Sequence, residues 1–375
     1  MSSLESRRLP SLATPVSAIG AGCWTIGGVA TNNGVPIGWD NVDSGAAYAG
    51  LCRASELGVT LYDTADVYGL GRSERLLGRL LAQLPRDDVV VCSKVGYFAG
   101  TGRHPYETAN IRHQLDTTLD NLGTDHLDVY FVHSSDFGEN DQYLPNAIAL
   151  MRELRQQGLI RAVGIRAPHS FAEEWTTENT TRGAAARRWT HLFHNIRPGI
   201  LTTRYNLLSP LYSADETDIF TFARRHGTGI LIKQALGQGT LVKTDHAGIT
   251  IRFSRGDHRR TDPLFTTANQ RSQHARLAPL RAKYGNDMPS LTRVALRYAL
   301  QHAPDAAVLV GFRNAEQIHA NITCLGGPLS PEEITEIRTL LHPTVAAPPR
   351  GTPVALHRSR EEVRPAQPGA AQGQT

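Results

Sequence analysis

Apolar residues along the chain gather in short runs, and longer stretches between them carry an apolar residue at every third or fourth position. A nearly continuous short apolar run is typical of a strand in a parallel sheet that is covered on both faces. The clearest runs span residues 58–64, 88–94, 127–133, 160–166, 229–234 and 306–312, and two weaker runs span 17–22 and 199–206. The pattern therefore predicts eight strands.

The stretches between these runs have the period of amphipathic helices. In "NIRHQLDTTLDNLG" (110–123), the apolar positions fall on one helical face; they are Ile111, Leu115, Leu119 and Leu122. Similar patterns occupy 73–84, 144–158 and 290–303. Gly123 and Gly158 stand where a glycine often ends a helix.

Eight strands with helical crossovers favour an α/β fold, the (β/α)8 TIM barrel, over an open sheet. We predict one barrel domain over residues 1–345, including a short N-terminal segment, with insertions at 30–43 and 242–265. Residues 346–375 are rich in Pro, Gly and Gln, which predicts a mobile tail.

Composition narrows the class of protein. The 375 residues carry a net charge of +4 with scattered basic residues, which disfavours a nucleic-acid partner. Four widely spaced cysteines without a CxxC pair disfavour a zinc site or a disulfide framework. The N-terminus lacks a signal-peptide pattern, and no apolar run is long enough to span a membrane. We expect a cytoplasmic protein, and the sequence does not indicate its oligomeric state.

Polar residues end three consecutive predicted strands, and the carboxyl ends of barrel strands carry the active site in this fold. Asp63, Lys94 and His133 hold these positions, and Tyr68 follows Asp63 in the same loop. The set suits carbonyl reduction. Tyr68 would donate a proton, Lys94 would lower its pKa from about 10, and Asp63 would orient Lys94. His133 would donate a hydrogen bond to the developing oxyanion.

Each of these residues also has a plain structural interpretation. Asp63 and Lys94 could form a structural ion pair at the barrel rim, Tyr68 could be a packing residue, and His133 a core histidine. Their placement together at consecutive strand ends favours the functional interpretation.

The whole barrel resembles the aldo-keto reductase superfamily. The resemblance rests on "SAIGAGCWTIGG", "GVTLYDTADVYGLGRSERLLGRLL", "VVVCSKVGYF", "LGTDHLDVYFVHSSD", "MRELRQQGLIRAVGI" and "AVLVGFRNAEQIHANI". It implies NADPH-dependent reduction of a ketone or aldehyde of a small to medium organic molecule, without a metal. Asp63, Tyr68, Lys94 and His133 match the catalytic tetrad of the family.

The resemblance also implies where the cofactor binds. "LIKQALGQG" resembles the pyrophosphate loop, in which the matching positions are Gln234, Ala235, Leu236, Gly237 and Gln238. "VGFRNAEQIHAN" resembles the adenosine-phosphate segment, in which they are Gly311, Arg313, Gln317 and Asn321. Arg313 is the candidate partner of a 2′-phosphate, and its alternative role is that of a solvated loop arginine.

The chain departs from the family around the nicotinamide. Arg166 and Ala167 replace the usual Ser-Asn pair, Thr202 replaces a glutamine, and Lys233 replaces a stacking aromatic residue. These changes leave the acid-base residues intact but alter the expected cofactor contacts.

Substrate identity depends on the loops, where Trp24, Trp39, Tyr97 and Phe98 could line an apolar pocket or serve in packing. Two other functions stay open. The altered nicotinamide contacts favour a non-catalytic, cofactor-binding regulatory protein on the same barrel. A barrel enzyme of another class, such as a lyase, could use Lys94 or Tyr68 as a base.

Overall fold

The computed structural model describes residues 4–32, 34–100, 102–243 and 251–342. Eight parallel strands close into a barrel, in which β12 pairs with β3, with Val308 opposite Ile19. The strands are β3 (Ile19–Gly22), β6 (Leu61–Asp63), β7 (Val90–Val95), β8 (Leu127–Val132), β9 (Ile160–Arg166), β10 (Ile200–Arg204), β11 (Gly229–Lys233) and β12 (Ala306–Gly311). The predicted (β/α)8 barrel is confirmed, with several strands shorter than the apolar runs that predicted them.

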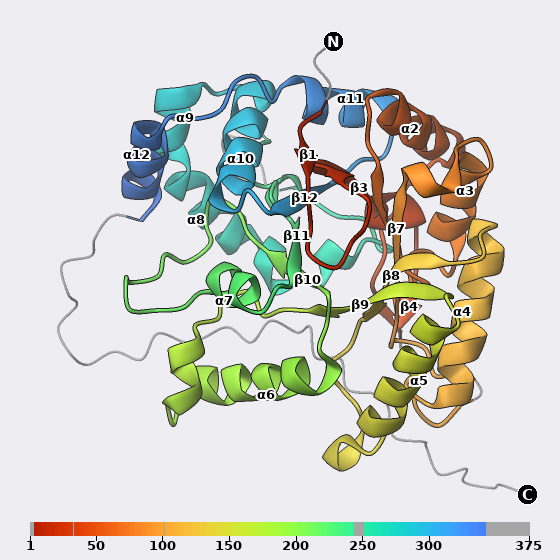
Figure 1. Cartoon of the computed structure of the whole chain (residues 1–375). Helices are drawn as coiled ribbons and strands as arrows, with labels where there is room; N and C mark the ends of the chain where they lie inside the picture. Colours follow the sequence, from red (N-terminus) through yellow and green to blue (C-terminus); the bar gives the residue numbers. More distant parts are fainter. Residues whose placement is uncertain (1–3, 33, 101, 244–250, 343–375) are drawn as a thin grey trace, which may run out of the picture.

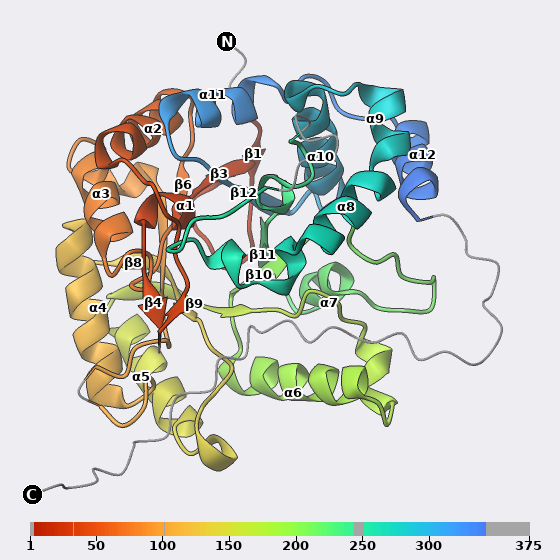
Figure 2. The same ribbon diagram turned by 180° about the vertical axis from the view of Figure 1, so that it is seen from behind.

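Helices surround the barrel on its outer side (Figures 1 and 2). They are α2 (Ser44–Glu56), α3 (Arg72–Leu81), α4 (Thr108–Leu122), α5 (Leu144–Gln156), α6 (Thr181–Ile196), α7 (Ile219–Arg225), α10 (Met288–His302) and α11 (Ala315–Thr323). Further helices are α1 (Trp24–Gly27), α8 (Thr267–Arg276), α9 (Ala278–Tyr284) and α12 (Pro331–Leu341). Gly123 ends α4 in the left-handed conformation at φ 62°, and Gly158 follows α5 at φ 77°. Both glycines lie at helix ends, as predicted, because a residue without a Cβ adopts this conformation easily.

A hairpin that the sequence pattern did not predict covers the N-terminal end of the barrel. Its strands, β1 (Ser6–Arg7) and β2 (Val16–Ser17), pair antiparallel. Leu9 and Val16 from this hairpin pack into the cluster of side chains inside the barrel, against residues such as Leu61 and Phe131. The hairpin lies in front of the barrel in Figure 1. The hairpin therefore fills the interior from this end.

The two predicted insertions meet at the opposite, C-terminal end of the barrel (Figure 2). The first contains a small hairpin of β4 (Thr31–Asn32) and β5 (Val35–Pro36). The second reaches it where the backbone N–H of His258 donates to the carbonyl of Gly38 at 2.9 Å. The two insertions are therefore in direct contact at this end of the barrel. The predicted tail, 346–375, lies outside the described residues.

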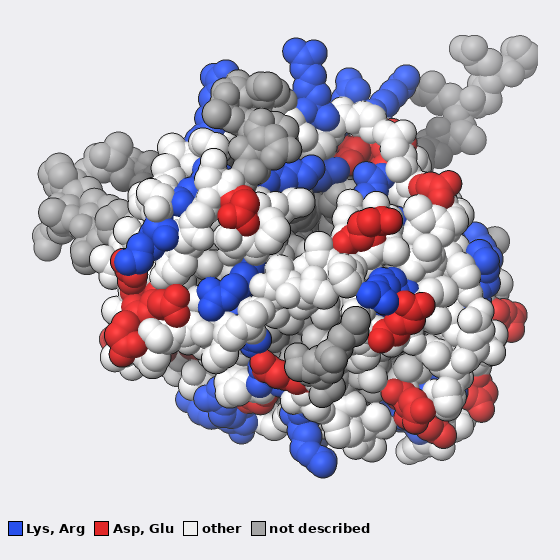
Figure 3. All heavy atoms as spheres, turned by 90° about the horizontal axis from the view of Figure 1, so that it is seen from above, with Lys and Arg blue, Asp and Glu red and all other residues white. Residues whose placement is uncertain are grey.

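The surface carries both signs of charge, and the face in Figure 3 has acidic and basic side chains interspersed. All four cysteines are free thiols. Within the described ranges, no helix is both long and apolar enough to cross a membrane, and no three His, Cys or acidic side chains are grouped as metal ligands.

Candidate active site

Asp63 and Lys94 form a buried ion pair at the carboxyl ends of β6 and β7. Lys94 Nζ lies 2.8 Å from Asp63 Oδ1 and 2.9 Å from Oδ2, and it also donates to the carbonyl of Thr64. The side chains are brought together because β6 and β7 are parallel neighbours, with Asp63 opposite Cys92 and Lys94 two residues further on. Asp63 and Lys94 expose only 6% and 4% of their surface, so the pair is shielded from water.

The pair holds Lys94 in its charged form. Burial lowers the pKa of the Lys94 ammonium, but Asp63 and Tyr68 together raise it above the ordinary value of a lysine. An opposite charge within a few ångströms in a dry site favours the ionised form strongly. Lys94 is therefore a fixed positive charge at the bottom of the mouth.

Tyr68 lies over this charge, with Lys94 Nζ 4.7 Å from the centre of its ring. The loop between β6 and α3 can take this course because Gly27 has no side chain: a Cβ there would approach the carbonyl carbon of Tyr68 to 2.7 Å. Gly69, Leu70 and Gly71 then turn the chain through positive φ angles into α3. Gly27, which the Tyr68 backbone contacts, and Gly69, which follows Tyr68 in the chain, thus set the position of the tyrosine.

The pKa of Tyr68 differs from the sequence prediction. Lys94 lowers this pKa, as expected, but burial outweighs Lys94 and raises the pKa to about 12. The expectation that Lys94 lowers the pKa of Tyr68 overall is wrong, because the tyrosine is more enclosed than its loop position suggested. The phenol is consequently protonated at neutral pH and able to donate.

His133 follows β8 and faces Tyr68 across the mouth, with the two ring centres 6.2 Å apart at an angle of 81°. Burial, and then the charges of Lys94 and other neighbouring cations, lower the pKa of His133 well below its usual value. The imidazole is therefore neutral at pH 7. Its Nδ1 is buried and has no hydrogen-bond partner within the described residues.

The residues at the altered nicotinamide positions come from three neighbouring strands: Arg166 ends β9, Thr202 lies in the middle of β10, and Lys233 ends β11. Arg166 is opposite Thr202 in register, and the backbone N–H of Ala167 donates to the carbonyl of Thr202 at 2.8 Å. Arg166 Nη1 also donates to the hydroxyl of Tyr97 at 3.0 Å. Lys233 ends β11 and acts electrostatically on both Asp63 and His133. Arg166 and Lys233 thus add positive charge around the tetrad residues.

The predicted pyrophosphate loop is a compact turn after β11. Gln234, Gly237 and Gln238 adopt positive φ angles of 57°, 56° and 55°, and Ala235 and Leu236 lie between them. Alternation of right- and left-handed backbone is the conformation that points N–H groups into a concave anion site. Asn206 Nδ2 donates to the carbonyl of Gln234 at 3.1 Å and fixes the start of the turn.

The predicted adenosine-phosphate segment is also internally bonded. Gln317 accepts from the backbone N–H of Arg313 at 2.9 Å, and Asn321 donates to the carbonyl of Gly311 at 3.3 Å. The Arg313 guanidinium donates to the carbonyl of Asp40 in the first insertion. Burial, and then the charge of Arg259, lower the pKa of Arg313.

Three of the four candidate pocket aromatics lie at the mouth, and a histidine that the sequence analysis missed lies among them. Trp24 and Trp39 meet edge to face at 5.5 Å, and Trp24 is 6.2 Å from Tyr68. The ring of His258 lies 4.4 Å from Trp24 and 4.9 Å from Trp39. Tyr97 packs on His133 at 4.6 Å.

Phe98, the fourth candidate aromatic, is half-buried beside Tyr97, and its carbonyl accepts from Asn110.

His258 ties the second insertion to the predicted cofactor loop. Its Nε2 lies 2.8 Å from Gln238 Oε1, and its Nδ1 lies 3.1 Å from the carbonyl of Gly38. Arg259, held by Asp257 at 2.7 Å, lies over Trp39 at 4.1 Å. The partners of His258, Gly38 and Gln238, lie 220 and 20 positions away along the chain.

Comparisons with known proteins show the family to which the chain belongs. The model of the Aldo/keto reductase family matches residues 18–342, so the chain belongs to this family. The chain is therefore an oxidoreductase of a family that uses nicotinamide cofactors and acts on small carbonyl compounds.

The chain is similar to several characterised relatives over nearly its whole length. It is 24% identical to L-galactose dehydrogenase of Arabidopsis thaliana, covering 92% of this chain and 96% of that protein. It is 27% identical to the NADH-specific methylglyoxal reductase of Escherichia coli, covering 89% and 98%. Among solved structures, glycerol dehydrogenase AKR11B4 of Gluconobacter oxydans aligns with a TM-score of 0.69 at 25% identity, covering 93% and 99%.

Proposed function

We propose that the protein is an NADPH-dependent reductase of ketones or aldehydes, with Tyr68 as the proton donor. The observation that carries this proposal is the buried Asp63–Lys94 pair beneath Tyr68, with a neutral His133 across the mouth. The domain that performs the reaction would span 1–345.

Each tetrad residue has a role that follows from its surroundings. Tyr68 carries a proton at neutral pH and gives it to the carbonyl oxygen as negative charge develops there. Lys94 stabilises the tyrosinate that forms, because its ammonium lies beside the ring and cannot easily lose its own proton. Asp63 keeps Lys94 charged and in place. Neutral His133 donates a hydrogen bond to the same oxygen.

The residues present fit a dinucleotide. A bound reduced nicotinamide supplies the hydride in this chemistry. The loop 234–238 offers a concave backbone to a pyrophosphate, and Arg166 and Thr202 offer donors and a hydroxyl to a carboxamide. Cationic Arg166 and Lys233 suit a site that receives negative charge. Arg166 and Lys233 stand where the family usually has an amide side chain and a stacking aromatic residue. For this reason a non-catalytic cofactor-binding protein is the second candidate function.

Preference for NADPH rests on Arg313 and Arg259. The charge of Arg259 disfavours the charged form of Arg313, and a 2′-phosphate beside Arg313 would favour that form through charge-assisted hydrogen bonds. The Escherichia coli relative is NADH-specific by its name, so preference must be measured for this chain.

The substrate is proposed to be a small to medium carbonyl compound with an apolar part. Trp24, Trp39 and Tyr97 line the mouth near Tyr68 and His133 and would contact that part.

The test is stopped-flow measurement of NADPH and NADH oxidation against a panel of aldehydes and ketones. Turnover with either cofactor supports a reductase, and faster reaction with NADPH supports the choice of cofactor. Tight binding of NADPH without oxidation by any carbonyl would favour the regulatory protein.

A further inference from the structure

The two prominent cavities in the described part of the chain lie away from the mouth. The first, of about 600 Å³, lies at the N-terminal end of the barrel, between the β1–β2 loop, the first residues of β7, β8 and β9, and the end of α5. The second, of about 350 Å³, lies on the outer side of β8 and β9, between α5 and α6. Both volumes fall in the range of small-molecule sites, which is about 300–1,000 Å³.

Arg152 and Arg155 line both cavities, so the two adjoin at these side chains. We call the combined depression the α5 groove. The outer half has an apolar wall, formed by Val132, Phe137, Ala147, Ile148, Met151, Val163 and Ile196. The half at the N-terminal end of the barrel has both apolar and polar lining residues, and the polar ones include Ser11, Thr14 and Arg161.

The charge of the groove is positive. Arg152 and Arg155 are exposed, and neither has a hydrogen-bond or ion-pair partner for its side chain within the described residues. Arg197 joins them from the end of α6 and is also exposed. Like charges three residues apart on a helix destabilise it. An anion between Arg152 and Arg155 would remove this repulsion.

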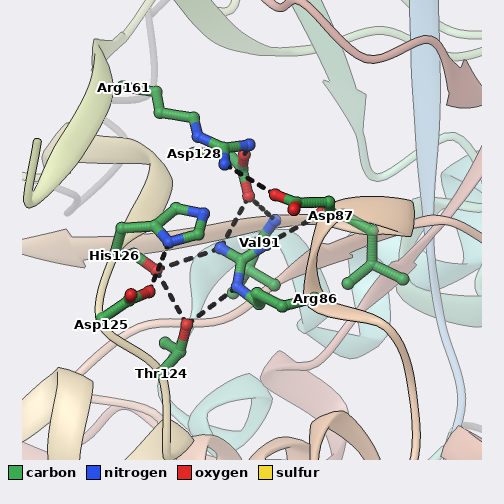
Figure 4. A network of polar contacts seen from close by, with 9 residues as sticks. Arg86, Asp87, Val91, Thr124, Asp125, His126, Asp128 and Arg161 are labelled. Carbon is green, nitrogen blue, oxygen red and sulfur yellow. Dashed lines mark hydrogen bonds and ion pairs between the residues drawn. The ribbon is translucent and has the colours of Figure 1, made fainter.

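The acidic residue in the groove does not neutralise these arginines. Asp128 is the carboxylate among the lining residues, and Figure 4 shows it enclosed by other partners. Its Oδ1 accepts from Arg161 at 2.8 Å, and its Oδ2 accepts from Arg86 at 2.8 Å and from the Val91 backbone at 2.9 Å. Both carboxylate oxygens of Asp128 thus have hydrogen-bond partners, and Arg86 and Arg161 balance its negative charge. Asp128 therefore does not neutralise Arg152 or Arg155.

A helix end alone could explain one of the arginines. Arg155 lies in the last turn of α5, where a cation interacts favourably with the helix carbonyls. Arg197 comes from a different helix, however, and it lines the cavity with the apolar wall together with Arg152 and Arg155. A basic rim beside an apolar wall has the chemistry of a site for a molecule that has both features.

We propose that the α5 groove binds a small amphiphilic anion, with its carboxylate or phosphate group between Arg152 and Arg155 and its aliphatic part between α5 and α6. The site is separate from the catalytic mouth, because its first half lies at the N-terminal end of the barrel and its second half lies on the outer side of β8 and β9. The proposal is independent of the reductase function.

The test is isothermal titration calorimetry with three probes: decanoate, decanol and inorganic phosphate. Decanoate should bind with one site per chain and more tightly than either other probe, because it alone offers both the anion and the chain. The double variant Arg152→Gln/Arg155→Gln should weaken decanoate by about tenfold or more. Ile148→Glu, which places a negative charge on the half-buried wall, should also weaken it.

Arg271→Gln on the exposed face of α8 removes one charge elsewhere and should leave binding unchanged. Decyl phosphate then distinguishes a phosphate from a carboxylate head group. Absence of decanoate binding, equal binding of decanol or phosphate, or unchanged binding in the arginine variant would overturn the proposal. Melting curves of each variant show that the fold is kept.

Discussion

Replacement of Lys94 by methionine separates its electrostatic role from its packing role. The methionine fills similar space but leaves Asp63 buried without its partner. Removing one member of a buried ion pair costs about 3–5 kcal/mol of the free energy of unfolding. With an unfolding entropy of about 2.1 cal/mol/K per residue over 375 residues, that loss lowers the melting temperature by roughly 4–6 °C.

The loss of stability in Lys94→Met should depend on pH. Without Lys94, burial keeps the pKa of Asp63 raised in the folded protein above its unfolded value. A carboxyl with a raised folded pKa destabilises the fold as pH rises above its unfolded pKa. The melting temperature of Lys94→Met should therefore approach that of the wild type in acid and fall further below it toward neutral pH.

The matched control is the double variant Asp63→Asn/Lys94→Met, measured by calorimetry and by steady-state reduction. It has no uncompensated buried charge, so most of the lost stability should return. Reduction should stay about 10²–10⁴-fold slower, because the tyrosinate still lacks a cation. Recovery of activity together with stability, or a single variant as stable as the wild type at neutral pH, would refute the reasoning.

Three further predictions concern the cofactor positions and His133. Arg313→Ala should weaken NADPH binding by tenfold or more, since a hydrogen bond to a charged group contributes about 1.5–3 kcal/mol, and should change NADH little; fluorescence titration with both cofactors checks this, and equal losses would contradict it. Arg166→Ser with Ala167→Asn should tighten NADPH and speed turnover if the nicotinamide is weakly held. Lost activity at unchanged cofactor affinity would instead assign Arg166 to the substrate. His133 should stay neutral from pH 6 to 8 in ¹⁵N NMR, because its pKa lies well below the usual value; protonation near pH 6.5 would contradict the burial argument. The same lowered pKa means that stability contributed by His133 is lost as pH falls below its unfolded value.

The barrel and the grouping of the tetrad could be predicted because both depend on local patterns. Apolar runs marked the eight strands, and parallel neighbouring strands bring their ends together whatever the loops do. Asp63, Lys94 and His133 therefore had to be neighbours. The β1–β2 hairpin could not be predicted in the same way, because each strand has two residues and no periodicity.

Contacts between residues that are far apart in the sequence also could not be predicted from it. His258 reaches Gly38 across 220 positions, and nothing local to either residue indicates the contact. The pKa of Tyr68 was misjudged for a related reason. The sequence indicated that the charge of Lys94 lies near Tyr68. The extent to which Tyr68 is buried, however, depends on how the loops and insertions pack over the site.

The central claim is that Tyr68 donates the proton in a carbonyl reduction. The most direct measurement is single-turnover stopped-flow reduction by Tyr68→Phe at saturating NADPH, with cofactor affinity measured alongside. The account predicts about 10²–10⁴-fold slower NADPH oxidation at unchanged NADPH affinity, because the variant lacks only the hydroxyl group. Wild-type oxidation rates in Tyr68→Phe would contradict it.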